Sequence, residues 1–136
     1  MKIKLINFGY KNAPLRAHSN DAGADVYSTV KTVLWPRDVV KIPLGFGLEL
    51  PDGYMACVYP RSGLSSMGIV CELPPIDSGY RGEVHAIVTN NSDKPFHIEE
   101  GDRIGQLVVT PVVIADFVTD TGEARGSGAF GSTGFN

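Results

Sequence analysis

Arginine stands within two residues of glycine at several places in this chain, a pairing that is typical of contact with phosphate. We call the arginines with a glycine at most two residues away glycine-flanked. They are Arg61 in RSG, Arg81 in YRG, Arg103 in GDRIG and Arg125 in RGSG. A planar guanidinium can bind two phosphate oxygens while the amides of neighbouring glycines approach closely. An arginine beside glycine can also mark no more than an exposed turn, so each site alone stays open. Their recurrence favours phosphate recognition.

The segment from Pro60 to Gly63 offers the most complete phosphate cradle. Arg61 supplies a guanidinium, Ser62 a hydroxyl, and Gly63 a backbone that an anion can approach closely. We expect a short helix from Ser62 to Met67, capped by Ser62, whose dipole would favour an anion. The alternative is a strand-to-helix turn with an exposed arginine.

Carboxylates form the second group of chemical interest. Asp77 follows an apolar run and precedes a Ser-Gly turn, where a carboxylate can accept a proton from water and orient it. The alternative is an Asx turn in which Asp77 caps its own backbone. Asp21 and Asp25 in DAGADV are too loosely placed for an all-protein metal cage. One carboxylate can still suffice for Mg²⁺, which takes most of its ligands from water and substrate phosphates.

Histidine and cysteine do not form a recognisable site. His18, His85 and His97 are scattered without metal-ligand spacing, so we expect surface or strand histidines. Cys57 and Cys71 lie in apolar runs without CxxC spacing, which predicts buried, reduced thiols in a cytoplasmic protein.

The first ten residues contain too short an apolar run for a signal or membrane span. A net charge of −3 without a basic run argues against a nucleic-acid partner.

The elements that must position these groups are β-strands. Short runs rich in Val, Ile and aromatic residues alternate with Pro-Asp-Gly, Asn-Asn-Ser-Asp and Glu-Glu-Gly-Asp turn signals. This spacing predicts an all-β sandwich or closed barrel in a single domain. The expected strands cover residues 3–8, 24–30, 32–36, 39–50, 54–60, 69–73, 83–90, 96–100 and 104–114.

The glycine-rich end of the chain differs from the rest. We divide the sequence into a β-barrel domain at 1–120 and a flexible arm at 121–136. Composition alone predicts that the arm is disordered. The alternative is a flap whose amides and hydroxyls, including Ser132 and Thr133, close over an anion.

Five segments together resemble the motifs of the trimeric dUTPase (deoxyuridine 5'-triphosphate nucleotidohydrolase) family. They are DAGADVYS at 21–28, YPRSGLSSMGI at 59–69, PPIDSGYRGEV at 74–84, GDRIGQLVV at 101–109 and RGSGAFGSTG at 125–134. The resemblance implies a jelly-roll-like β-barrel of the dUTPase-like, β-clip kind, assembled as a homotrimer with shared active sites. It also implies Mg²⁺-dependent hydrolysis of dUTP to dUMP and pyrophosphate.

The resemblance assigns roles to the phosphate-facing residues. It implies that Asp77 orients the water that attacks the α-phosphorus in line, and that Asp25 holds Mg²⁺ through a water, with Asp21 structural. Arg61, Ser62, Gly63 and Gln106 would contact the triphosphate. Arg103 stays open between a phosphate contact and a structural role, in which it pairs with Asp102 or braces a turn.

The resemblance also assigns residues to the nucleoside. Tyr80 would lie against the deoxyribose and exclude a 2′-hydroxyl, and the hairpin from Cys71 to Ile76, including Pro75, would read uracil. The family often has asparagine where Cys71 stands and a small residue near Pro74 or Pro75. If the family reads the base with an amide at position 74 or 75, this protein must read it differently, because proline has no amide hydrogen.

In the arm, the resemblance implies that Arg125 contacts the terminal phosphates, Phe130 stacks on the base, and Ser132 and Thr133 bind the γ-phosphate. Gly131 belongs to the same set of substrate contacts. Stacking of a base on an aromatic ring contributes ~1–3 kcal/mol, enough to order a flexible arm only when substrate is present.

Two other functions are compatible with part of this pattern. A dCTP deaminase shares the expected fold, but its glutamate ten residues after the motif aspartate is absent, because Ile87 stands there. A non-catalytic trimeric β module that binds a nucleotide or a protein is the other alternative. The joint presence of Asp77, Arg61, Gln106 and Phe130 favours the enzyme, since a binder has no need of a water-orienting carboxylate.

Overall fold

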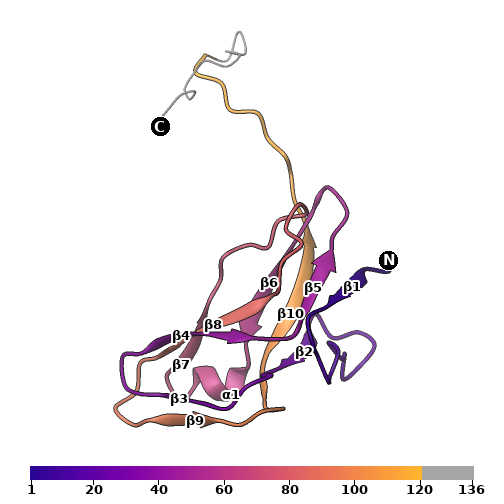
Figure 1. Cartoon of the computed structure of the whole chain (residues 1–136). Helices are drawn as coiled ribbons and strands as arrows, with labels where there is room; N and C mark the ends of the chain where they lie inside the picture. The colour runs from indigo at the N-terminus through magenta and orange to yellow at the C-terminus, as the bar shows by residue number, and fades with distance from the viewer. Residues whose placement is uncertain (121–136) are drawn as a thin grey trace.

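The computed structural model describes residues 1–120, and the all-β prediction is confirmed. Five predicted site residues, Arg125, Phe130, Gly131, Ser132 and Thr133, lie outside the described residues. The elements are β1 (Lys4–Asn7), β2 (Ala24–Tyr27), β3 (Thr32–Leu34), β4 (Val39–Pro43), β5 (Phe46–Glu49), β6 (Tyr54–Pro60), α1 (Ser62–Ser65), β7 (Ile69–Glu72), β8 (His85–Asn90), β9 (Phe96–Ile98) and β10 (Arg103–Pro111) (Figure 1).

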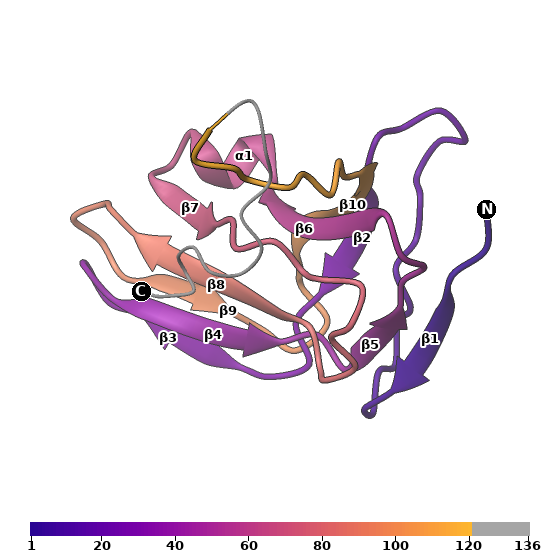
Figure 2. The same cartoon turned by 90° about the horizontal axis from the view of Figure 1, so that it is seen from above.

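The strands pair antiparallel in four small sheets, ordered β2-β10-β6, β4-β8-β7, β1-β5 and β3-β9. Seen from above, β3, β4, β7, β8 and β9 lie on one side of the body and β1, β2, β5, β6 and β10 on the other (Figure 2). Across residues 1–120 the four ladders do not join into one closed barrel.

The core lies between these two groups of strands. Its largest fully buried side chains are Phe46, Leu34, Ile42, Leu44, Ile69 and Ile98. Strand β8 shows why the sheets have an inner and an outer face, since Ala86 and Val88 are buried while His85, Ile87 and Thr89 are only half-buried. This alternation follows from the period of two in a strand.

No helix in the described part of the chain is long and apolar enough to cross a membrane.

The predicted strand at 39–50 is two strands, and Gly45 is the reason. Gly45 adopts φ +84, and a Cβ there would lie 2.7 Å from the Cα of Tyr10. The chain therefore turns between β4, which pairs with β8, and β5, which pairs with β1. The apolar pattern continues through the break, so periodicity alone did not reveal it.

Candidate active site

Asp25 and Gln106 face each other on the sheet β2-β10-β6. Gln106 is the register partner of Asp25 on one side and of Tyr59 on the other. Since register partners share a face, these three side chains project from the same side of the sheet. Val26 and Leu107, the next residues along β2 and β10, are buried in the core on the opposite side.

Arg103 joins this row through an irregularity in β10. The register shifts between Arg103 and Gly105, which places Arg103 on the same face as Gln106 although the two are three residues apart. Arg103 Nη1 donates to Asp25 Oδ2 at 3.1 Å. From the sequence, Asp102 could pair with Arg103 or brace a turn. It accepts from the Glu99 amide through Oδ2 at 2.9 Å and so braces the turn before β10.

Arg61 reaches the same place from the end of β6. Its Nη1 donates to the Arg103 carbonyl at 3.2 Å. Two of the glycine-flanked arginines within residues 1–120 therefore meet at one site. We call this set the phosphate cluster, made up of Asp25, Arg61, Ser62, Gly63, Arg103 and Gln106.

Ser62 does not cap the helix, contrary to the sequence-based expectation. Helix α1 spans only Ser62–Ser65; Arg61 occupies its N-cap position, and no side chain caps it. Leu64 anchors the turn in the core, whereas Ser62 and Gly63 are exposed beside Arg61. The exposed hydroxyl and the open glycine, around which an added Cβ would meet nothing within 4 Å, leave room for a ligand.

Gly23 is a site residue that the sequence analysis did not single out. A Cβ at Gly23 would lie 2.7 Å from Gln106 Oε1 and 2.9 Å from Gln106 Cβ, so only glycine leaves room for the Gln106 side chain. Gln106 Nε2 in turn donates to the Pro60 carbonyl at 3.4 Å. The position of Gly23 inside the DAGADV motif was a sequence signal for this role.

The loop before β2 is closed by Asp21. Asp21 Oδ2 accepts from the His18 amide at 2.9 Å and lies 3.1 Å from His18 Nδ1, while Arg16 donates to the Asp21 carbonyl at 2.8 Å. The backbones of Leu15 and Asp25 exchange two hydrogen bonds at the base of the loop. Asp21 thus orders the loop that delivers Asp25.

A second group of predicted residues lines a cavity of ≈ 210 Å³ on the other sheet. We call it the β4–β8 pocket. Its lining residues are Lys41, Pro74, Pro75, Ile76, Asp77, Tyr80, Glu83, Val84, His85 and Ile87. The structure therefore brings Pro75, Ile76, Asp77 and Tyr80 together. Lys41, Glu83 and His85 line the same cavity although the sequence analysis assigned them no part in a site.

Cys71 does not line this pocket. It is the register partner of Val88 and packs against the core, so its substrate contact stays a prediction. Burial and the neighbouring Glu72 raise the pKa of the Cys71 thiol to about 11, and burial also raises the pKa of Cys57. Both cysteines are free; Cys57 is buried as expected, whereas Cys71 is only half-buried. Within residues 1–120 no group of three or more His, Cys, Asp or Glu side chains could hold a metal by itself.

Tyr80 is fixed at the edge of the pocket by Gly82 and Glu83. Its hydroxyl donates to the Glu83 carbonyl at 2.7 Å, and a Cβ at Gly82 would lie 2.6 Å from that hydroxyl. Arg81, although flanked by glycine, bends back and donates to the Ser78 carbonyl. It therefore braces the turn at 78–81, and the ring of Tyr80, 45% exposed, is held in place for a ligand.

Asp77 is exposed at the mouth of the pocket. Its carbonyl accepts from the Tyr80 amide at 3.0 Å, but among the described residues its carboxylate has no hydrogen bond or ion pair. The Asx turn considered from the sequence is not formed. The carboxylate is thus free to accept a proton from water.

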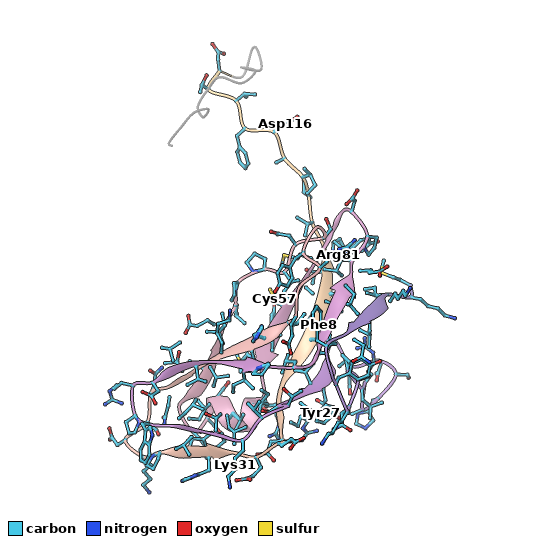
Figure 3. All side chains as sticks on the ribbon, viewed as in Figure 1. Phe8, Tyr27, Lys31, Cys57, Arg81 and Asp116 are labelled. Carbon is cyan, nitrogen blue, oxygen red and sulfur yellow. The ribbon has the colours of Figure 1, made fainter. Side chains whose placement is uncertain are left out.

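The phosphate cluster and the β4–β8 pocket lie far apart in one chain. Ile76 and Ala56 exchange two backbone hydrogen bonds, of 2.7 and 3.1 Å, which fixes Asp77 near the start of β6. Arg61 follows the end of β6, five residues after Ala56 and thus roughly 17 Å away along the strand. Arg81 accordingly lies towards the end of the body where the C-terminal segment leaves, and Tyr27, next to the phosphate cluster, lies towards the other (Figure 3).

Comparison with known proteins identifies the family of this chain. A family model described as dUTPase matches residues 9–134. Proteins named deoxyuridine 5'-triphosphate nucleotidohydrolase from Tropheryma whipplei and Clostridium tetani are 45% and 40% identical to this chain. These alignments cover 96% and 98% of this chain, and 92% and 96% of the two relatives.

Solved structures show the same similarity. A mutant dUTPase from phage phi11 of S. aureus, described with a coordinated structural Mg(II) ion, aligns with a TM-score of 0.82 at 25% identity, over 89% of this chain and 97% of that one. A mutant dUTPase of Staphylococcus bacteriophage 80alpha with dUpNHpp aligns with a TM-score of 0.81 at 26% identity, over 98% of both chains. This chain belongs to the dUTPase family.

Proposed function

We propose that this protein hydrolyses dUTP to dUMP and pyrophosphate. The observation that carries the proposal is the β4–β8 pocket, in which the free carboxylate of Asp77 lies beside the immobilised ring of Tyr80. The pocket suits a nucleoside, because it joins apolar walls to a few polar groups. Membership of the dUTPase family, whose relatives carry the nucleotidohydrolase name, supports the same substrate.

Asp77 is the general base of the proposed reaction. Its carboxylate orients a water molecule and takes its proton as the oxygen attacks the α-phosphorus in line. The bond from the α-phosphorus to the bridging oxygen breaks, and pyrophosphate leaves with that oxygen. Tyr80 supports the sugar next to this centre, where an added 2′-hydroxyl would meet the ring.

The phosphate cluster binds the triphosphate. Arg61 provides paired donors, and Ser62, Gly63 and Gln106 add a hydroxyl, a close backbone and an amide. From the arm, Arg125, Phe130, Gly131, Ser132 and Thr133 complete the site as the sequence predicts. Closure of that arm would exclude bulk water and strengthen the electrostatic interactions inside.

Mg²⁺ is the proposed cofactor, and the residues of the phosphate cluster fit it. Only one oxygen of the Asp25 carboxylate is engaged by Arg103, so the other remains for a metal-bound water. Mg²⁺ usually keeps several waters and takes its inner ligands from phosphates, so it needs no cluster of carboxylates. When bound, the ion neutralises charge on the phosphate oxygens.

A homotrimer with shared active sites explains why the two halves of the site are separated in one chain. Asp77 lies beside the start of β6 and Arg61 follows its end, with Ala56 and Arg61 roughly 17 Å apart along the strand. A triphosphate does not bridge that separation, so each complete site takes its halves from different subunits. The segment after β10 supports association, because it leaves the body and exposes large apolar side chains (Figure 1). These are Val113, Ile114, Phe117 and Val118.

The free thiols Cys57 and Cys71 fit the cytoplasm as the place of this reaction.

Parallel assays with dUTP, UTP, dTTP and dCTP test the proposal. Purified protein with Mg²⁺ should release pyrophosphate from dUTP and use the other nucleotides poorly. Binding of dUTP without hydrolysis of any nucleotide would instead identify a non-catalytic binding protein. Equal use of UTP would remove the role given to Tyr80.

A further inference from the structure

One wall of the β4–β8 pocket offers no backbone hydrogen-bond donor. Pro74 and Pro75 have no amide hydrogen. The amide of Ile76 already donates to the Ala56 carbonyl at 2.7 Å. A uracil ring presents an N3–H group between two carbonyl oxygens, and those oxygens need donors. The donors for a base in this pocket must therefore come from elsewhere than residues 74–76.

Another part of the pocket lining is the outer face of β4 and β8. Lys41 is the register partner of Ile87, and Pro43 is the register partner of His85. Because Ala86 lies between them and is fully buried in the core, the side chains of His85 and Ile87 project outward. Lys41, Ile87 and His85 consequently share the outer face of this sheet and line the pocket together with Pro74 and Pro75.

Lys41 contributes a cation without a partner. Among residues 1–120 its ammonium has no hydrogen bond or ion pair, and it lines the pocket together with Pro74 and Pro75. An ammonium donates up to three hydrogen bonds and accepts none. It therefore matches a carbonyl oxygen and not an amino group.

His85 contributes an acceptor, and its tautomer is set by Glu83. The Nδ1 atom lies 3.1 Å from the Glu83 carbonyl, which can only accept, so Nδ1 carries the proton. In the neutral ring Nε2 is then an acceptor. The same carbonyl also accepts from the Tyr80 hydroxyl, so one atom orients both rings.

We infer that Lys41 and His85 read the pyrimidine base, with Lys41 donating to a carbonyl oxygen and His85 Nε2 accepting the N3–H proton. This inference rests on the proposed dUTP hydrolysis and assigns the base recognition within it. Cytosine presents the reverse pattern, since its N3 is an acceptor and its 4-amino group a donor. An acceptor would face His85 Nε2 and a donor would face Lys41, and such unpaired groups cause strong rejection.

Thymine provides an internal reference. It has the same N3–H and carbonyl groups as uracil, so Lys41 and His85 do not distinguish the two. A change that removes base reading should therefore alter the preference for dUTP over dCTP and leave the preference for dUTP over dTTP unaltered. A general disturbance of the pocket would change both preferences.

Single variants of the full-length protein test the inference. Lys41→Met keeps the apolar stem without the donor, and His85→Ala removes the acceptor. Lys4→Met and His97→Ala are matched controls, because both residues are exposed on strands outside the pocket. The ratio of kcat/KM for dUTP to that for dCTP should fall about tenfold or more in each pocket variant. The dUTP to dTTP ratio should stay within about twofold.

A binding measurement separates this inference from the proposed function. Calorimetry with α,β-imido-dUTP should show weaker binding by both pocket variants, and Lys41→Arg should recover part of it, since arginine restores the donors. Wild-type protein that hydrolyses no dUTP would contradict the proposed function. Wild-type protein that is active, with both pocket variants retaining the full dUTP to dCTP ratio, would overturn the base-reading assignment alone.

Discussion

The guanidinium of Arg103 donates to the carboxylate of Asp25 at 3.1 Å, across the antiparallel pair of β10 and β2. The contact exists because a register shift in β10 turns Arg103 to the outer face. The carboxylate side chain is 20% exposed and the arginine side chain 45%. Arg103 is therefore a positioning residue for Asp25.

Arg103→Met should lower kcat/KM for dUTP by about tenfold. Asp25 loses the contact that orients it, and the triphosphate loses a nearby positive charge. The free energy of unfolding should change by no more than about 1 kcal/mol, since the pair is partly exposed. Activity at saturating Mg²⁺ and denaturant unfolding measure the two effects. Lys11→Met, which breaks the exposed pair with Glu100, is the control and should change neither appreciably. Normal kinetics of the Arg103→Met protein would show that Arg103 has no part in positioning Asp25 for catalysis.

Asp77→Asn should lower kcat by about 10²–10⁴-fold, the usual contribution of a positioned general base. Binding of α,β-imido-dUTP should persist, because Asp77 makes no contact that holds the pocket together. Single-turnover kinetics and calorimetry distinguish the two effects. Asp93→Asn removes a carboxylate whose pairing with Arg37 lies outside both halves of the site, and should leave kcat unaltered. Substantial turnover by Asp77→Asn would disprove the general-base role.

Gly82→Ala should weaken the rejection of UTP. The new Cβ would lie 2.6 Å from the Tyr80 hydroxyl, so the ring must move away from the position where it supports the sugar. We expect the ratio of kcat/KM for dUTP to that for UTP to fall by about tenfold. Gly79→Ala is the matched control from the same loop, since a Cβ there meets nothing within 4 Å. Equal effects of the two changes would mean that Tyr80 does not exclude the 2′-hydroxyl.

Gly45→Ala should destabilise the fold more than Gly53→Ala. Both glycines have positive φ, +84 and +87, so alanine costs about 1–2 kcal/mol at either position. Only at Gly45 would the Cβ also meet backbone, 2.7 Å from Tyr10 Cα, which forces the loop at residue 10 to shift. Chemical denaturation should show an additional loss of about 1–3 kcal/mol at Gly45. Equal losses would show that this loop adapts freely.

The sequence predicted most strands of this fold because turn signals and alternating apolar residues agree. It did not predict the division at Gly45, since apolar residues continue on both sides and the break depends on the approach of Tyr10. Nor did the sequence predict that Arg103 contacts Asp25. That contact requires the register shift in β10, which no local pattern reveals.

Candidate site residues were recognised from the sequence where residue types are unusual for a strand or turn. Asp77, Arg61 and Gln106 stand in motifs, and the structure places Asp77 in the β4–β8 pocket and the other two in the phosphate cluster. Their contacts with a ligand stay predictions. Lys41 and His85 were not recognised, because a lysine and a histidine in alternating strands are ordinary outer-face residues. Only the pairing of β4 with β8 brings them into one pocket with Pro74 and Pro75.

The division of the active site between subunits can be measured directly by mixing two inactive variants. Asp77→Asn damages the pocket half and Arg61→Ala the phosphate half, so each homo-oligomer should be inactive towards dUTP. When the two are unfolded together and refolded, random assembly should give sites in which both halves are intact, with about a quarter of the wild-type pyrophosphate release. Activity no higher than that of either variant alone would contradict the account, because it would place both halves of each site in one chain.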